Sequence, residues 1–182
     1  MIKRLAQSIN RNCSNHPKLS EVACAASLAH HGYLGPVKGL SLWNVYLSSV
    51  PVDQLASLVS CVTGGVYIAY VGGCDLSPIL DSLQCKTLEI DSQSLNTEET
   101  QALVRAMETG VEEVSLSYYH GNVDIETLTM YSGQGKCRLV RCNETRYHDA
   151  LRNWKKMQEI CERRKWTLTQ HNYRSIELKV VD

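Results

Sequence analysis

The sequence predicts an α/β solenoid, in which short strand–helix units stack side by side between a helical cap and a cap of one helix and two strands. Three observations predict this fold: the chain matches itself at one long shift, the matched apolar residues recur at a shorter period, and turn residues fall between the predicted strands and helices. Self-similarity at a fixed period is the sequence signature of repeat architectures. We expect one domain, with a first cap at 1–36, about four to five repeat units at 37–145 and a second cap at 146–182.

The self-match is found when the chain is shifted by 48 residues. It covers a predicted strand, the corner after it and the following helix, and then a second strand. The matched pairs include Leu40 with Leu88, Leu42 with Ile90, Leu47 with Leu95, Leu55 with Leu103, Val66 with Val114, and Ile68 with Leu116. Four of these strand positions, namely Leu42, Ile68, Ile90 and Leu116, follow one another by 26, 22 and 26 residues. The short period therefore predicts one strand and one helix in each unit.

Each unit has a physical reason to stack on its neighbour. Alternate residues of a strand point to one side, so Leu40 and Leu42 are expected in the core together with the corner residue Leu47. The helix that follows presents an apolar stripe to the same core. Neither the strand nor the helix can bury its apolar side alone, so the units are expected to be stable only as an array.

The first cap is predicted to contain two helices, Ile2 to Asn10 and Ser20 to His30. Val22, Ala25, Ala26 and Leu28 lie on one side of the second helix at helical spacing. Pro36 then precedes the first predicted strand, as expected where a helix has ended.

Turn and capping residues predict where the helices of the repeats begin. Ser49 and Pro51 open the helix that carries Leu55, with the proline near its first turn, and Asp75, Ser77 and Pro78 repeat this pattern before Ile79 and Leu80. Asn96 followed by Glu99 has the spacing of a capping box, and Gly110 is placed to end that helix.

The second cap begins with a long helix from Tyr147 to Lys165. Its residues at helical spacing are Leu151, Trp154, Met157 or Gln158, and Ile160 or Cys161. Residues Trp166 to Thr169 and Ile176 to Val180 alternate as strands. We expect them to form a closing pair with Asn172 near the turn.

This spacing resembles that of the leucine-rich repeats of the ribonuclease-inhibitor type, which also occur in intracellular innate-immune receptors. The resemblance covers roughly residues 37 to 145. It implies parallel strands on a concave face, helices on a convex face, and a protein-binding function without catalysis. Two units depart from the pattern: the unit near Val66 is four residues short and has Gly73 at its corner, and the unit near Val114 moves its corner to about Val123.

Positions that differ across the 48-residue shift predict the binding face. Trp43 pairs with Asp91, Tyr46 with Ser94 and Tyr67 with Ser115, although the core positions beside them agree. If alternate strand residues face the core, the residues between them face the concave side. We therefore expect a partner protein to be bound by Ser41, Trp43, Tyr46, Tyr67, Glu89, Asp91, Ser115 and Ser117.

Composition disfavours several other functions. Lys plus Arg equals Asp plus Glu, at 19 each, so no global field attracts nucleic acid or an anionic membrane, and neither is an expected partner. The eight cysteines have no zinc-type pairing: Cys137 and Cys142 with His148, and His30 and His31 beside Cys24, do not match two close pairs. We expect reduced, mostly buried thiols, no metal, no cofactor and no catalytic site.

Two alternatives to a protein-binding module stay open at the level of sequence. One is an enzyme whose site carries no familiar motif. The other is a nucleic-acid contact through the basic residues between 152 and 165, although Asp and Glu residues interleave with them and favour a self-paired helix face. The N-terminus lacks an apolar signal core, which predicts a cytoplasmic protein, with mitochondrial targeting as the alternative because the first twenty residues are basic.

Overall fold

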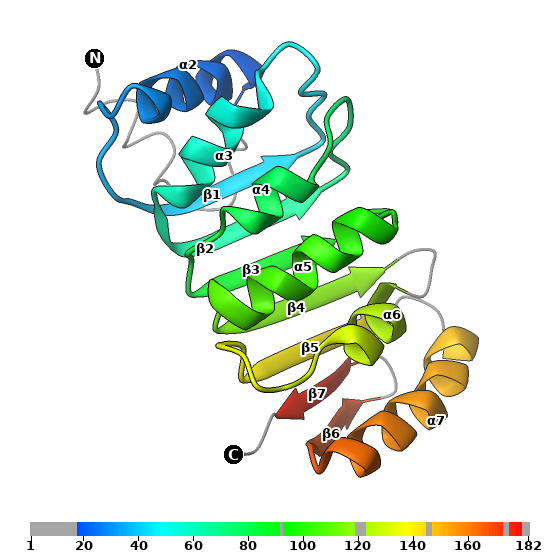
Figure 1. Cartoon of the computed structure of the whole chain (residues 1–182). Coiled ribbons are helices and arrows are strands. Elements are labelled where there is room, and N and C mark those ends of the chain that lie inside the picture. The colour runs from blue at the N-terminus through cyan, green and yellow to red at the C-terminus, as the bar shows by residue number, and fades with distance from the viewer. Residues whose placement is uncertain (1–17, 92, 119–122, 145–146, 173–174, 180–182) are drawn as a thin grey trace.

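The computed structural model describes residues 18–91, 93–118, 123–144, 147–172 and 175–179. Helices and strands alternate along this part of the chain (Figure 1). The helices are α2 (Leu19–His30), α3 (Val52–Ser60), α4 (Ser77–Asp81), α5 (Thr97–Thr109), α6 (Val123–Met130) and α7 (Tyr147–Arg164). The strands are β1 (Val37–Trp43), β2 (Val62–Ala69), β3 (Thr87–Asp91), β4 (Glu113–Tyr118), β5 (Leu139–Glu144), β6 (Thr167–Asn172) and β7 (Ser175–Lys179).

All seven strands form one sheet in the order β1-β2-β3-β4-β5-β7-β6. The first five strands are parallel to their neighbours, and β7 pairs antiparallel with both β5 and β6. One row of register partners runs across the parallel strands through Leu42, Ile68, Ile90, Leu116 and Cys142. The predicted side-by-side placement of the first four residues is therefore confirmed, and Cys142 extends the same row by a further 26 residues.

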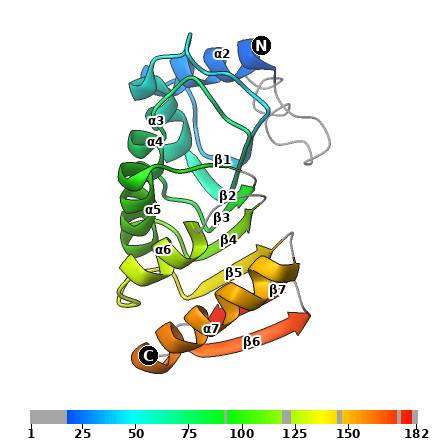
Figure 2. The same ribbon diagram turned by 90° about the vertical axis from the view of Figure 1, so that its right-hand side faces the viewer.

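The helices α3, α4, α5 and α6 lie on one face of the sheet (Figure 2). Each packs against the next helix of the series, and α2 and α7 extend the row at its two ends. The core lies between the helices and the sheet, where Leu42, Ile68, Ile90 and Leu116 are at most 1% exposed. The fold is thus an α/β arrangement with a five-strand parallel sheet, compatible with a solenoid-like stack of strand–helix units.

The predicted second helix of the first cap is confirmed as α2, where Val22, Ala25 and Ala26 are buried against the core. The helix predicted for residues 2–10 lies outside the described residues. Pro51 is the N-cap of α3 rather than a first-turn residue, whereas α4 has its proline in the first turn as expected.

The predicted capping box of α5 is confirmed, and it also joins two units. Asn96 Oδ1 accepts a hydrogen bond from Glu99 N at 2.9 Å, and Glu99 Oε2 accepts one from Asn96 N at 2.9 Å. The second oxygen, Glu99 Oε1, accepts a hydrogen bond from Leu76 N at 3.0 Å. Glu99 is only 8% exposed, so a buried carboxylate links the start of α5 to the start of α4.

Gly110 follows α5 as predicted, but its φ of −119° shows that a left-handed turn is not the reason for glycine there. A Cβ at Gly110 would collide with the carbonyl oxygen of Leu83. Close approach of the preceding unit explains this glycine. Left-handed backbone occurs instead just after two strands, at Asn44 (φ 49°) and Tyr70 (φ 51°), which lie beside each other at the end of the β1–β2 pair.

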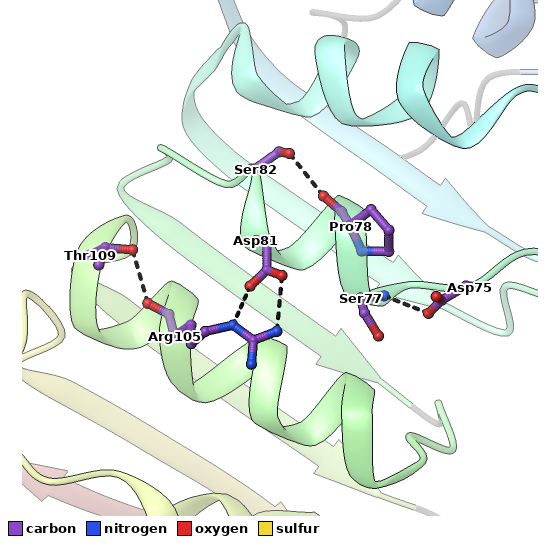
Figure 3. Close-up of polar contacts among 7 residues, drawn as sticks. All are labelled: Asp75, Ser77, Pro78, Asp81, Ser82, Arg105 and Thr109. Carbon is purple, nitrogen blue, oxygen red and sulfur yellow. Dashed lines mark hydrogen bonds and ion pairs between the residues drawn. The ribbon is translucent and has the colours of Figure 1, made fainter.

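The exposed side of the helix layer is joined by an ion pair between α4 and α5 (Figure 3). Arg105 Nε and Nη2 donate to the two carboxylate oxygens of Asp81 at 2.8 and 2.9 Å. Near the start of α4, Ser77 N donates to Asp75 Oδ1 at 2.9 Å. The ion pair therefore joins α4 to α5, and Asp75 contacts the backbone at the start of α4.

The second cap contains the predicted helix and the predicted strand pair. Met157, Ile160 and Cys161 of α7 are buried in the core. Arg164 does not project into solvent with the other basic residues: its Nη2 donates to Thr129 O at 2.6 Å, and its guanidinium lies 5.0 Å from the centre of the Trp166 ring. Within the described ranges, no helix combines the length and the apolar character needed to cross a bilayer.

Candidate functional site

The face of the sheet opposite the helices carries the residues predicted to bind a partner. Its middle row runs through Ser41, Tyr67, Glu89, Ser115 and Arg141, and its next row runs through Trp43, Ala69, Asp91 and Ser117. Apart from Ala69, which is itself buried, these residues alternate in each strand with buried core residues, as the pleat requires. The structure therefore brings together all the predicted face residues except Tyr46, which follows β1 and forms an isolated bridge with Gly72.

Two acidic residues of β3 lie at the centre of this face. Tyr67 is the register partner of Glu89, and its hydroxyl donates a hydrogen bond to Asp91 Oδ2 at 3.1 Å. Partial desolvation by the surrounding side chains raises the pKa of Glu89, although the residue as a whole stays exposed, and the charge of Asp91 raises it further. Desolvation, and then Asp91, raise the pKa of Tyr67 to about 12. The phenol therefore stays a hydrogen-bond donor near neutral pH.

A second charged cluster lies on β4, β5 and β7, and the sequence did not reveal it. Arg141 donates through Nη1 to Glu113 Oε2 and through Nε to Glu177 Oε2, both at 3.2 Å. Lys179 Nζ lies 3.5 Å from Glu177 Oε1. Desolvation is the largest single influence on Glu177 and would raise its pKa, but the hydrogen bonds and charges of Arg141 and Lys179 together lower the pKa. The sequence did not reveal the cluster because its pattern did not predict that β7 pairs with β5.

Aromatic side chains are exposed near the ends of β1 and β2. Trp43 is 39% exposed, Tyr46 is 67% exposed and Tyr70 is 51% exposed. The ring of Tyr46 lies so close to Gly72 and Gly73 that a Cβ at Gly73 would meet its ring carbons at about 3 Å. Glycine at the predicted corner position 73 is therefore explained by its left-handed backbone (φ 77°) together with the tyrosine ring beside it.

Gln93 holds the loop that follows β2, and no sequence pattern had singled it out. Its Oε1 accepts a hydrogen bond from Val71 N at 2.8 Å, and its Nε2 donates to Val71 O at 3.0 Å. One side-chain amide thus satisfies both backbone groups of a residue that is 7% exposed. The contact fixes the edge of the candidate face between the units of β2 and β3.

The cysteines of the described chain are free thiols, and four of them are buried: Cys85, Cys137, Cys142 and Cys161. Burial raises the pKa of Cys85, Cys137 and Cys161 to about 11 in each case. Such thiols are poor nucleophiles at neutral pH because the thiolate is the reactive form. No group of three or more His, Cys, Asp or Glu side chains in the described part of the chain is arranged to hold a metal ion.

One Ser–His–Asp arrangement was not recognised in the sequence. His30 Nδ1 lies 3.4 Å from Ser57 Oγ, and His30 Nε2 lies 3.8 Å from Asp53 Oδ2. The Ser57 hydroxyl, however, donates to Asp53 O at 2.8 Å, and the Asp53 side chain is 66% exposed. A serine whose proton is directed at a backbone carbonyl is not activated by the histidine. We interpret these residues as a surface contact between α2 and α3.

The basic residues of α7 do not form a continuous patch among the described side chains. Lys155 and Lys156 are exposed, but so are the acidic residues Glu159 and Glu162. Arg163 Nε donates to Glu159 O at 3.1 Å, and Arg164 is used in the packing described above. Acidic and basic side chains thus interleave along this helix, which does not favour a phosphate-binding surface, and the contact of Arg163 is with a backbone carbonyl.

A cleft of about 350 Å³ lies between α7 and β6, away from the candidate face. Its lining combines two tryptophans with polar residues: Trp154, Gln158, Cys161, Glu162, Lys165, Trp166 and Leu168. None of these residues pairs a nucleophile with a base.

No family model, no curated protein and no solved structure matched this chain in the comparisons. The α/β arrangement with its five-strand parallel sheet is therefore established by the structure alone. The resemblance to leucine-rich repeats stays a prediction based on spacing.

Proposed function

We propose that this protein is a leucine-rich-repeat module of the ribonuclease-inhibitor type that binds another protein through the concave face of its sheet, and that it is not an enzyme. One observation carries the proposal. The core rows repeat apolar residues from strand to strand, whereas the rows between them carry Trp43, Tyr67, Glu89 and Asp91 at equivalent places. A frame that repeats while its outward side chains differ is typical of a recognition surface on a solenoid.

Two further features support a binding role. The exposed aromatic residues Trp43, Tyr46 and Tyr70 belong to the residue types that supply most hot spots of protein interfaces. The face also has side chains held in place before a partner arrives, because Tyr67 is tied to Asp91 and Gln93 fixes the adjoining loop. Preorganised side chains lower the entropy cost of association.

The test is affinity purification of the full chain followed by mass spectrometry, with quantitative comparison of variants. Trp43→Ala and Glu89→Gln alter the face, and Tyr33→Ala and Glu159→Gln are matched controls at exposed positions outside it. We expect one or a few proteins to be lost with both face variants and kept with both controls. Proteins that stay bound to both face variants would show that the function lies elsewhere on the molecule.

A further inference from the structure

The strand β6 at one end of the described sheet has an open edge (Figure 1). β7 pairs with one side of β6, and no described strand lies on the other side. In an antiparallel pair, every second residue turns both its N–H and its C=O group away from the partner strand. The regular pairing of β6 covers Thr167 to Gln170, before the register shifts between Gln170 and Asn172. The outer side of this segment therefore presents backbone donors and acceptors to a further strand.

The residues of β6 do not include those that usually protect an edge strand. Prolines and charged side chains, especially lysine, commonly prevent such edges from pairing. The strand β1 at the other end of the sheet follows this rule, since it comes directly after Pro36 and carries the exposed Lys38. β6 contains no proline, lysine, arginine or acidic residue, and its exposed Thr167 and Thr169 are of a type that favours strands. The composition of β6 is thus compatible with pairing to another strand.

The cleft between α7 and β6 lies beside this edge. Its described lining comes from α7, from the residue before β6 and from β6 itself. Arg164 of α7 faces α6, where its Nη2 donates to Thr129 O. The lining residues Trp154, Gln158 and Lys165 form a stripe about a quarter of a turn round the helix from Arg164. The cleft therefore opens on the flank of α7 that is turned away from α6, along the outer edge of β6.

The pleat of β6 determines which side chains of an added strand would enter the cleft. Leu168 is in register with Leu178, which is in register with the buried Val140, so Leu168 lies on the helix side of the sheet. Register partners on neighbouring strands point to the same face. A ligand residue paired with Leu168 would thus lie under α7, near the half-buried Trp154 and the buried Trp166. The residues on either side of it would point to the opposite face.

We propose that the open edge of β6 and the adjoining cleft bind an extended peptide segment of another protein, which adds a strand to β6 and inserts an aromatic or large aliphatic side chain beside Trp154 and Leu168. The edge selects this class of ligand, because an extended backbone matches a row of alternating donors and acceptors, and a pocket beside the edge then selects the side chain. The cleft of about 350 Å³ is at the small end of ligand pockets, which suits one or two inserted side chains. β6 lies outside the sheet face discussed above, so this inference is independent of the proposed function.

The probe is a random peptide library displayed on phage, depleted on the Trp154→Ala variant and then selected on the unmodified full chain. We expect the selected peptides to alternate apolar and polar residues around an aromatic or large aliphatic residue. In fluorescence anisotropy, replacement of that residue by aspartate should lower the affinity about tenfold. N-methylation of single peptide amides should lower the affinity about tenfold at every second residue and little at the residues between, because only alternate amides donate to β6. Trp43→Ala, which removes a tryptophan from the sheet face, is the matched control and should leave the affinity unchanged.

Hydrogen exchange read by mass spectrometry locates the contact without a substitution in the protein. Peptide binding should slow the exchange of amides between Thr167 and Gln170 and leave those of β1 unchanged. Unchanged exchange in β6, an N-methylation series without a two-residue period, or a selection that yields no binder would overturn the proposal. Concentration-dependent dimerisation in sedimentation velocity that Trp154→Ala abolishes would also overturn it, because a second copy of the chain would then occupy the edge.

The folding of the depletion variant is checked separately. A circular dichroism spectrum and a urea midpoint close to those of the unmodified protein establish that Trp154→Ala is folded. If it is not, Gln158→Arg takes its place, since it introduces a charge into the cleft from a half-buried position on α7. The aspartate and N-methyl series change only the peptide, so they test the proposal with the protein unaltered.

Discussion

Replacement of Glu99 by alanine should destabilise the protein far more than replacement of the glutamate beside it. Glu99 is 8% exposed and accepts hydrogen bonds from Asn96 N within its own helix and from Leu76 N in the preceding unit. Leu76 is 2% exposed, so in Glu99→Ala its N–H group would be buried without an acceptor. The carboxylate therefore contributes both to helix capping and to the contact between units.

The magnitude follows from the two bonds. A buried donor without a partner costs about 1–3 kcal/mol, and loss of a capping interaction costs about 1 kcal/mol. We expect the free energy of unfolding of Glu99→Ala to fall by about 3 kcal/mol. In urea denaturation followed by circular dichroism, this loss lowers the midpoint by about 1–2 M.

The neighbouring residue supplies the control. Glu98 lies in the same first turn of α5 and has the same charge, but it is exposed. Glu98→Ala removes only the interaction with the helix dipole, worth about 0.3–1 kcal/mol. Glu99→Gln keeps one acceptor oxygen and should fall between the two variants. Equal urea midpoints for Glu99→Ala and Glu98→Ala would refute the reasoning that a buried carboxylate couples α4 to α5.

Four further predictions concern the loops and the thiols. Gln93→Ala should lower the free energy of unfolding by about 1–3 kcal/mol in the same assay, because it leaves both backbone groups of Val71 without partners; an unchanged midpoint would contradict this. Tyr70→Asn should stabilise the fold by about 1 kcal/mol and raise its melting temperature, because asparagine tolerates the left-handed conformation better than tyrosine. A lower melting temperature would show that the contacts of the tyrosine ring stabilise the fold by more than the backbone strain destabilises it. Iodoacetamide at pH 8, read by mass spectrometry, should modify the exposed Cys24 in the native protein but reach the buried cysteines only in denaturant. Above pH 9 the thiols of the unfolded chain lose protons that the buried thiols of Cys85, Cys137 and Cys161 keep, so the free energy of unfolding should fall as pH rises towards 11. The urea midpoint should therefore be lower at pH 10 than at pH 8. Equal midpoints at the two pH values would contradict this role of the three thiols.

The sequence predicted the frame of the fold because the frame depends on local periodicity. Leu42, Ile68, Ile90 and Leu116 were expected side by side and are register partners. The position of Cys142 in the same row was not anticipated, since a cysteine between Arg141 and Asn143 does not look like a core residue of a strand. Free cysteine nevertheless behaves as a small apolar residue when buried.

The candidate face was predicted in part, because it also depends on local periodicity. Strand alternation placed Trp43, Glu89 and Asp91 outward without knowledge of their neighbours. The contacts of Gln93 and Glu99 could not be predicted from the sequence, because each links one unit to the backbone of another. Their distances depend on how tightly the units stack. The cluster around Arg141 could not be predicted either, because it requires β7 to lie between β5 and β6.

The reversed strand β7 ends the parallel part of the described sheet but not the sheet itself. A further strand–helix unit cannot extend the parallel ladder through β7, since that strand runs the other way. Five parallel strands spaced about 4.8 Å apart span about 19 Å, and the antiparallel strands β7 and β6 carry the same sheet about 10 Å further. A linear ligand that lies across the whole sheet would therefore cover about 29 Å, which an extended chain crosses in about nine residues.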